Sequence, residues 1–159
     1  MLFRSDGALP SGNAAAAHVF VRLFAITGKE IWRSRRDRQL AFLAGASQRY
    51  ASAHCSALQA MLGVLYPSTE LLCVTSAAGA EAEAAFSRLS KMKLPPNTTL
   101  LLKHSGNQEQ LSELAPFTAD YPLPKTGTQY YLCRENTCLA PFSSLKELEE
   151  YLAENGGRQ

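Results

Sequence analysis

Leu71-Leu72-Cys73-Val74-Thr75 and Thr98-Thr99-Leu100-Leu101-Leu102 are the stretches that decide the fold of the second half of this sequence. Each is a short apolar run with the length of a buried strand. The residues from Glu81 to Met92 place apolar side chains at helical spacing, and Pro95-Pro96-Asn97 ends this helix. A strand, a helix and a strand within about 30 residues form a βαβ unit, in which we expect parallel strands and a right-handed connection.

The sequence after this unit predicts three more elements. Residues 108–114 form a short helix, and residues 128–133 form a third strand that carries two tyrosines. Ser144 and Glu147 have the spacing of a capping box, which opens a terminal helix that ends at Gly156-Gly157. The second half of the chain is therefore expected to be a small α/β domain.

The first half of the sequence has a helical pattern. Apolar residues recur at helical spacing, and either Ser11 or Asn13 can cap the first helix. The three predicted helices run from just after Pro10 to about Thr27, from about Glu30 to Gly45, and from about Ala51 to Tyr66. Short connections between successive helices favour antiparallel hairpins.

The change of pattern near Tyr66-Pro67-Ser68 marks the expected domain boundary. We expect helical hairpins over residues 1–67 and a βαβ-containing subdomain with a C-terminal helix over residues 68–159. The predicted fold class is therefore mainly α with a small α/β part.

The composition is that of an ordinary globular protein. Of the 159 residues, 46% are hydrophobic and 19% are charged, and the net charge is +2. Such a small charge predicts neither a nucleic-acid partner nor a membrane partner, and no apolar run approaches the roughly 20 residues that span a bilayer. The first six residues lack the apolar core of a secretory signal, and four cysteines are too few for a disulfide scaffold. These features predict a cytoplasmic protein.

One segment is strongly basic, the run Arg33-Ser34-Arg35-Arg36-Asp37-Arg38 in the second predicted helix. Its simplest interpretation is the solvated face of an outer helix. RNA binding is the weaker alternative, because no aromatic residues alternate with the arginines. The predicted partners therefore include no nucleic acid.

The string Asp6-Gly7-Ala8-Leu9-Pro10-Ser11-Gly12-Asn13 combines turn formers and helix caps directly before the first helix. On composition alone it is a turn followed by a cap, in which Asp-Gly makes the turn and Ser11 or Asn13 satisfies the first helix amides.

Four residues separate Cys133 from Cys138, just past the third predicted strand. This spacing differs from the Cys-x-x-Cys motif of thioredoxins. Two packed or partly exposed thiols around a turn are the main interpretation, and a reversible disulfide, which makes them a possible redox pair, is an alternative. A zinc site needs four ligands, and the remaining cysteines and histidines show no paired spacing, so we predict neither a metal nor a cofactor.

Taken together, residues 6–13 and the segment Cys133-Arg134-Glu135-Asn136-Thr137-Cys138-Leu139-Ala140-Pro141 resemble the C-terminal part of the thioredoxin-domain-containing family related to spermatogenesis-associated protein 20. Tyr131, Cys133, Cys138 and Pro141 match the family pattern, whereas Glu135 and Thr137 depart from it. The resemblance implies the last helical hairpins of a six-hairpin α/α toroid, followed by a small α/β subdomain. It also implies that the chain is a fragment that lacks the N-terminal part of the same protein.

The resemblance implies two alternative functions. In the first, the intact protein is an enzyme that acts on a small polar or sugar-like substrate, and this chain supplies part of one rim of the toroid. Asp6 is then the catalytic candidate, and Ser11 and Asn13 are the substrate-binding candidates. A glycosidase needs two carboxylates, so the fragment is expected to be inactive alone. In the second, the protein is a non-catalytic, redox-linked scaffold or interaction module.

Overall fold

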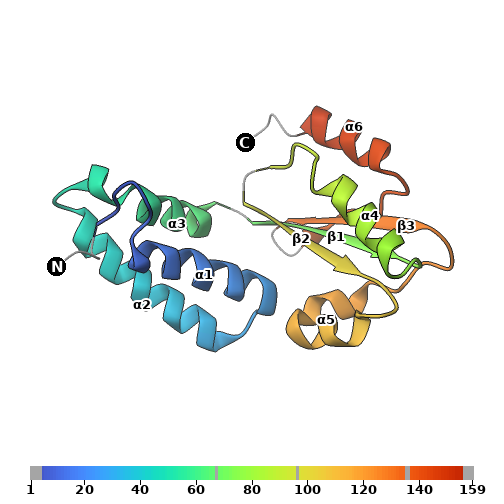
Figure 1. The fold of residues 1–159 in the computed structure, drawn as a ribbon, viewed down its shortest axis with the longest axis horizontal. Coiled ribbons are helices and arrows are strands. Elements are labelled where there is room, and N and C mark those ends of the chain that lie inside the picture. The colour runs from blue at the N-terminus through green and yellow to red at the C-terminus, as the bar shows by residue number, and fades with distance from the viewer. Residues whose placement is uncertain (1–4, 67, 96, 135–136, 156–159) are drawn as a thin grey trace. The chain divides into compact units, whose positions relative to one another are not determined.

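A computed structural model of the chain describes residues 5–66, 68–95, 97–134 and 137–155. The chain divides into two compact units, Met1–Pro67 and Ser68–Gln159 (Figure 1). The first unit is helical and the second combines helices with a small mixed sheet. The fold is thus mainly α with a small α/β part, as the sequence predicts.

The described residues of the helical unit form three α-helices and one short 3₁₀ turn. They are α1 (Gly12–Thr27), α2 (Glu30–Ser47), the 3₁₀ turn η1 (Ala51–His54) and α3 (Cys55–Leu65). Ser11 caps α1, and Gly28 ends it in the left-handed conformation with φ 63°, which glycine adopts without steric cost. The third predicted helix is therefore divided into a 3₁₀ turn and an α-helix.

The core of the helical unit is built mainly from small residues. Leu43 of α2 is fully buried against alanines of α1 and α3. Because alanine adds only one carbon to the helix surface, three helices can approach closely around one leucine, and interiors this dense tolerate little change in volume. The buried residues of this cluster are Ala14, Ala17, Leu43, Ala57 and Ala60.

The second unit is built on a sheet of four strands in the order β2-β1-β3-β4. Its strands are β1 (Thr69–Thr75), β2 (Thr98–Lys103), β3 (Thr128–Arg134) and β4 (Thr137–Cys138). β1 and β2 are parallel, which confirms the expectation for the βαβ unit. β3 runs antiparallel to both β1 and β4.

Different helices pack on the two faces of this sheet. Helices α4 (Ala80–Leu89) and α6 (Leu145–Asn155) cover one face, and α5 (Gln108–Leu114) lies on the opposite side (Figure 1). Side chains alternate between the two faces along each strand. The residues of one strand that pack under α4 and α6 are therefore two positions apart in the sequence, as Leu71 and Cys73 are in β1. The buried residues of this main core are Leu71, Cys73, Leu89, Tyr130, Leu132, Phe142 and Leu148.

Three details differ from the sequence prediction. α4 ends at Leu89 rather than at Met92, because the amides of Lys91 and Met92 donate to the carbonyls three residues before them, those of Arg88 and Leu89, instead of four residues before them as in an α-helix. The two-residue strand β4 and the 3₁₀ turn η2 (Pro116–Asp120) were not predicted. β4 is shorter than the four residues or more over which a periodic pattern becomes visible, and η2 is a five-residue 3₁₀ turn whose segment has no apolar repeat of helical spacing.

Leu148 is the α6 residue most dependent on this core, because it is completely buried against the sheet. We expect Leu148→Ala to lower the free energy of unfolding of the α/β unit by about 2–5 kcal/mol, as for other buried leucines. Urea unfolding followed by circular dichroism measures this change. Leu114→Ala is the matched control, since Leu114 is 57% exposed in the same unit; a similar loss in both variants would contradict the packing described here.

Candidate functional site

Asp6 links the beginnings of two helices. Its Oδ1 accepts a hydrogen bond from the amide of Ser11 at 2.8 Å, and its Oδ2 accepts from the amides of Ser56 at 2.8 Å and Ala57 at 3.4 Å. Ser11 is the N-cap of α1, and Ser56 and Ala57 lie in the first turn of α3. The amides of a first helical turn lack partners within their own helix. A single carboxylate therefore satisfies donors of two helices.

The environment of Asp6 keeps its carboxyl ionised. Burial acts to raise its pKa, but the hydrogen bonds from Ser11, Ser56 and Ala57 outweigh burial and hold the pKa below its ordinary value of 3.8. A general acid at neutral pH needs a raised pKa. Asp6 therefore has the electrostatics of a structural anion or a base, rather than those of an acid.

Ser11 and Asn13 also make internal hydrogen bonds. The hydroxyl of buried Ser11 accepts from the amide of Ala14 at 3.2 Å, which is the N-cap interaction expected from the sequence. Gln39 of α2 donates to the backbone carbonyl of Asn13 at 3.0 Å and to its side-chain oxygen at 3.2 Å. The structure thus brings Asp6, Ser11 and Asn13 together at the start of α1, where each connects this loop to a neighbouring element.

His18 and His54 lie in the same unit. His18 Nε2 is 3.0 Å from the carbonyl of Ser56 and 3.3 Å from its hydroxyl, so His18 connects α1 to α3. His54 is buried, and its Nδ1 has no hydrogen-bond partner among the described residues. His18 and Ser56 were not predicted as neighbours of Asp6, because they are distant in sequence and neither belongs to a motif.

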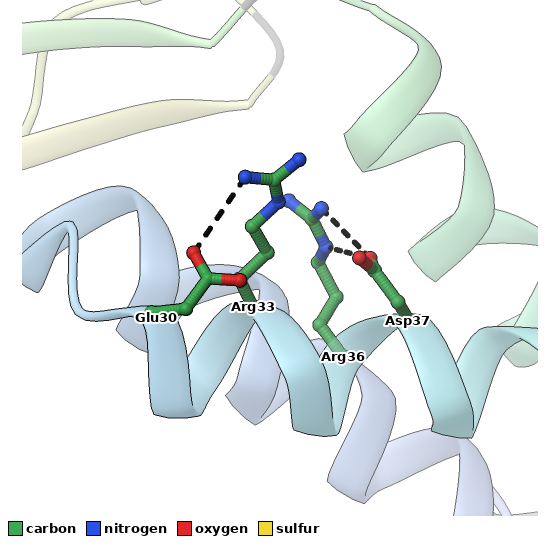
Figure 2. Close-up of polar contacts among 4 residues, drawn as sticks. All are labelled: Glu30, Arg33, Arg36 and Asp37. Atoms are coloured by element: carbon green, nitrogen blue, oxygen red, sulfur yellow. Dashed lines mark hydrogen bonds and ion pairs between the residues drawn. The ribbon is translucent and has the colours of Figure 1, made fainter.

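The arginine run lies on α2 and forms ion pairs within that helix. Figure 2 shows Arg33 beside Glu30, with 3.6 Å between the charged atoms, and Arg36 beside Asp37, at 2.7 Å. Pairs of this kind on an exposed helix contribute little to stability. Most of the arginines are exposed, as expected for a solvated face.

Aromatic rings lie beneath two of these arginines. The guanidinium carbon of Arg35 is 5.1 Å from the centre of the Trp32 ring, and that of Arg36 is 4.7 Å from the Phe24 ring. Trp32 also stacks on Phe20 of α1, with 6.1 Å between ring centres. The sequence pattern did not reveal this arrangement, because two of the three rings come from α1 rather than from the arginine run.

Cys133 and Cys138 form a disulfide across the β3–β4 hairpin. The two residues are directly opposite each other in the strand register, and Arg134 is opposite Thr137. Cys133 is buried and Cys138 is exposed. The chain-entropy estimate for closing so short a loop is about 2 kcal/mol of stabilisation.

Tyr121 lies beside this disulfide, although no sequence pattern identified it. Its hydroxyl is 3.2 Å from Cys133 Sγ and also contacts Cys138 Sγ. The Tyr121 ring packs on Tyr131, with 4.6 Å between ring centres. Burial, followed by the nearby Asp120, raises the pKa of Tyr121, so its hydroxyl stays protonated at neutral pH.

Lys103 holds the segment that carries Tyr121. Its buried ammonium donates to the carbonyls of Thr118 at 2.6 Å and Tyr121 at 2.7 Å. Burial lowers the pKa of Lys103, while the negative charge of Asp120 opposes that shift. The sequence signal was a lysine at the end of an apolar strand, where a charged residue needs a buried partner.

Neither unit supplies a preformed metal site within the described residues, where no three His, Cys, Asp or Glu side chains are grouped to bind an ion. No helix in the described ranges is both long enough and apolar enough to cross a bilayer.

One curated protein is similar to this chain over most of its length. Human spermatogenesis-associated protein 20 is 27% identical over 150 residues, which cover 92% of this chain but only 19% of that protein. The chain therefore spans about a fifth of the relative that it matches. No protein-family model matches the sequence, and no solved structure matches the fold. The similarity is that of a distant relative to a portion of a larger protein.

Replacing the Asp6 carboxylate tests its bridging role. We expect Asp6→Asn to destabilise the helical unit by about 1 kcal/mol at neutral pH, because one of the two acceptor oxygens becomes an NH₂ group that cannot accept, and one hydrogen bond to a helix start is lost. Because folding lowers the pKa of Asp6, its stabilisation is fully present above the ordinary value of 3.8 and is lost as the pH falls through the folded value. The difference between wild type and variant should therefore shrink below that pH, as measured by urea unfolding.

Glu30→Gln is the matched control, because Glu30 is an exposed carboxylate in the first turn of α2. Its effect should stay within about 0.5 kcal/mol. An Asp6→Asn variant as stable as wild type at pH 7 would show that the carboxylate does not hold the two helices together.

Alkylation followed by mass spectrometry distinguishes the four cysteines. Iodoacetamide should modify exposed Cys55 in the native protein. Cys73 should react only in denaturant, because burial raises the pKa of its thiol to about 11 and only the thiolate is reactive. Cys133 and Cys138 should react only after reduction. Their modification in denatured, unreduced protein would mean that the disulfide does not form.

Proposed function

We propose that this chain is the C-terminal portion of a larger protein related to spermatogenesis-associated protein 20, and that its helical unit packs against the rest of that protein. The observation that carries this proposal is the distribution of exposed apolar side chains. Among the described residues, nine of the large hydrophobic side chains that are exposed belong to the helical unit and two belong to the α/β unit. In the helical unit they are Leu9, Val19, Ile31, Phe42, Tyr50, Leu62, Val64, Leu65 and Tyr66.

The alanine-rich core explains this distribution. Alanines bury little surface per residue, so much of the apolar surface of the three helices remains outside the core. In a closed α/α toroid, neighbouring hairpins cover such surface. Apolar side chains exposed in this number are typical of a surface that contacts another protein, and the partial coverage of the human relative supports a partner within the same protein.

In this proposal the chain is inactive by itself. A glycosidase needs two carboxylates, and Asp6 supplies only one, both of whose oxygens accept hydrogen bonds from backbone amides. The enzymatic version places Asp6, Ser11 and Asn13 on the rim of a cleft for a small polar or sugar-like substrate, with catalytic partners from the remaining hairpins. A pair of carboxylates facing the centre of the complete toroid would favour this version over a scaffold.

The disulfide favours a second candidate, a redox-linked interaction module. A Cys-x-x-Cys motif near a βαβ unit is typical of thioredoxin-like redox domains. Here residues 76–79 follow β1 and contain no cysteine. Any thiol chemistry of this unit would therefore reside in the β3–β4 hairpin. In a cytoplasmic protein, such a disulfide is usually transient or redox-sensing.

Self-association of the purified chain tests the packing proposal. We expect oligomers in light scattering at micromolar concentration, together with binding of a hydrophobic dye, because exposed apolar surface promotes association. Leu62→Gln combined with Leu65→Gln should reduce both signals, since these side chains are 46% and 76% exposed and lie one turn apart on α3.

The matched control is Leu114→Gln, which changes an equally exposed leucine in the α/β unit and should leave both signals unchanged. A strictly monomeric wild-type chain that binds no dye would contradict the proposal, because it would mean that the apolar side chains are covered within the chain itself.

A further inference from the structure

The β3–β4 hairpin has the arrangement of a thiol–disulfide exchange site. Cys133 and Cys138 face each other directly in the strand register. The amide of Leu139 donates to the carbonyl of Leu132 at 3.0 Å, which makes the cysteines a non-hydrogen-bonded pair, the type in which opposite side chains are closest. β4 is an edge strand of only two residues, so one side of the hairpin is open.

The two sulfurs differ in access. Cys138 is exposed, whereas Cys133 is only 5% exposed. A thiolate from solution can therefore approach Cys138 more readily than Cys133. Exchange rates depend on which sulfur is attacked and on how well the departing sulfur carries negative charge.

Tyr121 is placed to stabilise the departing sulfur. Its hydroxyl lies against both sulfurs, closer to Cys138 Sγ and 3.2 Å from Cys133 Sγ, and Lys103 and the Tyr131 ring hold it in position. A hydrogen bond to a charged acceptor is stronger than one between neutral groups. The hydroxyl would thus interact more strongly with a Cys133 thiolate than with the disulfide.

Contacts other than the disulfide also hold this edge of the sheet. Beyond β4, the chain returns to β3 through two backbone hydrogen bonds between Tyr130 and Phe142, at 3.0 Å and 2.9 Å. Phe142 itself belongs to the main core. Reduction therefore removes one covalent bond from an edge that backbone pairing and packing also hold.

We propose that this hairpin exchanges electrons with low-molecular-weight thiols, and that Tyr121 is the catalytic hydrogen-bond donor to Cys133.

The thiolate of one thiol attacks Cys138 Sγ, forming a mixed disulfide and breaking the bond to Cys133 Sγ. The electron pair remains on Cys133, which accepts a hydrogen bond from Tyr121 and then a proton from solvent. A second thiolate attacks the external sulfur of the mixed disulfide and releases Cys138. Two thiols thereby become one disulfide, and the protein gains two electrons and two protons. This site does not depend on the proposed role of the helical unit.

Reduction kinetics of the folded protein test the role of Tyr121. Wild type, Tyr121→Phe and Tyr131→Phe are treated with glutathione at neutral pH, quenched with iodoacetamide and analysed by mass spectrometry. Tyr121→Phe should slow reduction about tenfold, the effect of losing a hydrogen bond to a charged group. Tyr131→Phe keeps the ring that packs on Tyr121 and should change the rate less than about twofold. In concentrated urea, all three proteins should react at one rate.

Single cysteine variants test which sulfur is attacked. With oxidised glutathione, Cys133→Ser should form a mixed disulfide at the exposed Cys138, whereas Cys138→Ser should react much more slowly at the buried Cys133. Equal rates for wild type and Tyr121→Phe would overturn the role of Tyr121. If glutathione reduces the wild-type disulfide only in urea, the folded hairpin is not an exchange site. The same conclusion would follow if oxidised glutathione modified Cys133 faster than Cys138. Circular dichroism of each variant shows whether it is folded, so that a change in rate is not mistaken for an effect of unfolding.

Discussion

The carboxylate of Asp6 is the constraint on which the helical unit depends. It receives amide hydrogen bonds from residues 5, 50 and 51 positions away, so one side chain fixes the start of α1 against the start of α3. Both helix starts carry partial positive charge, which an anion at their junction neutralises. The alanine core requires close approach of the same helices, and this junction sets their spacing at one end. The loop before α1 is therefore a fixed part of the structure.

Element types were predictable wherever a periodic pattern extended over several residues. The apolar runs in β1 and β2 and the spacing in α1 and α3 identified the correct elements, because burial of one face imposes such patterns on the sequence. β4 has only two residues and exists through its pairing with β3. No local preference could reveal it. η2 also depends on a contact that is distant in sequence, because the ammonium of Lys103 in β2 donates to the carbonyl of Thr118 in η2.

The candidate sites were only partly predictable, because their decisive contacts are distant in sequence. The composition of residues 6–13 identified a turn and the Ser11 cap, but the amides of Ser56 and Ala57 could not be deduced as partners of Asp6. The spacing of the two cysteines was compatible with free thiols, a disulfide or a metal site. Strand register decides among these, because it places Cys133 directly opposite Cys138. Tyr121 joins the pair only through tertiary structure.

The division of the chain separates two kinds of chemistry. The helical unit carries the arginine run and most of the exposed apolar side chains, while its polar loop is occupied by internal hydrogen bonds. The α/β unit has a core of large side chains and few exposed hydrophobic residues, and it carries the disulfide with Tyr121. Exposed apolar surface marks protein contacts, which is why we propose a protein neighbour for the helical unit and none for the α/β unit. Each unit has its own hydrophobic core, so thiol chemistry in one does not require the packing of the other.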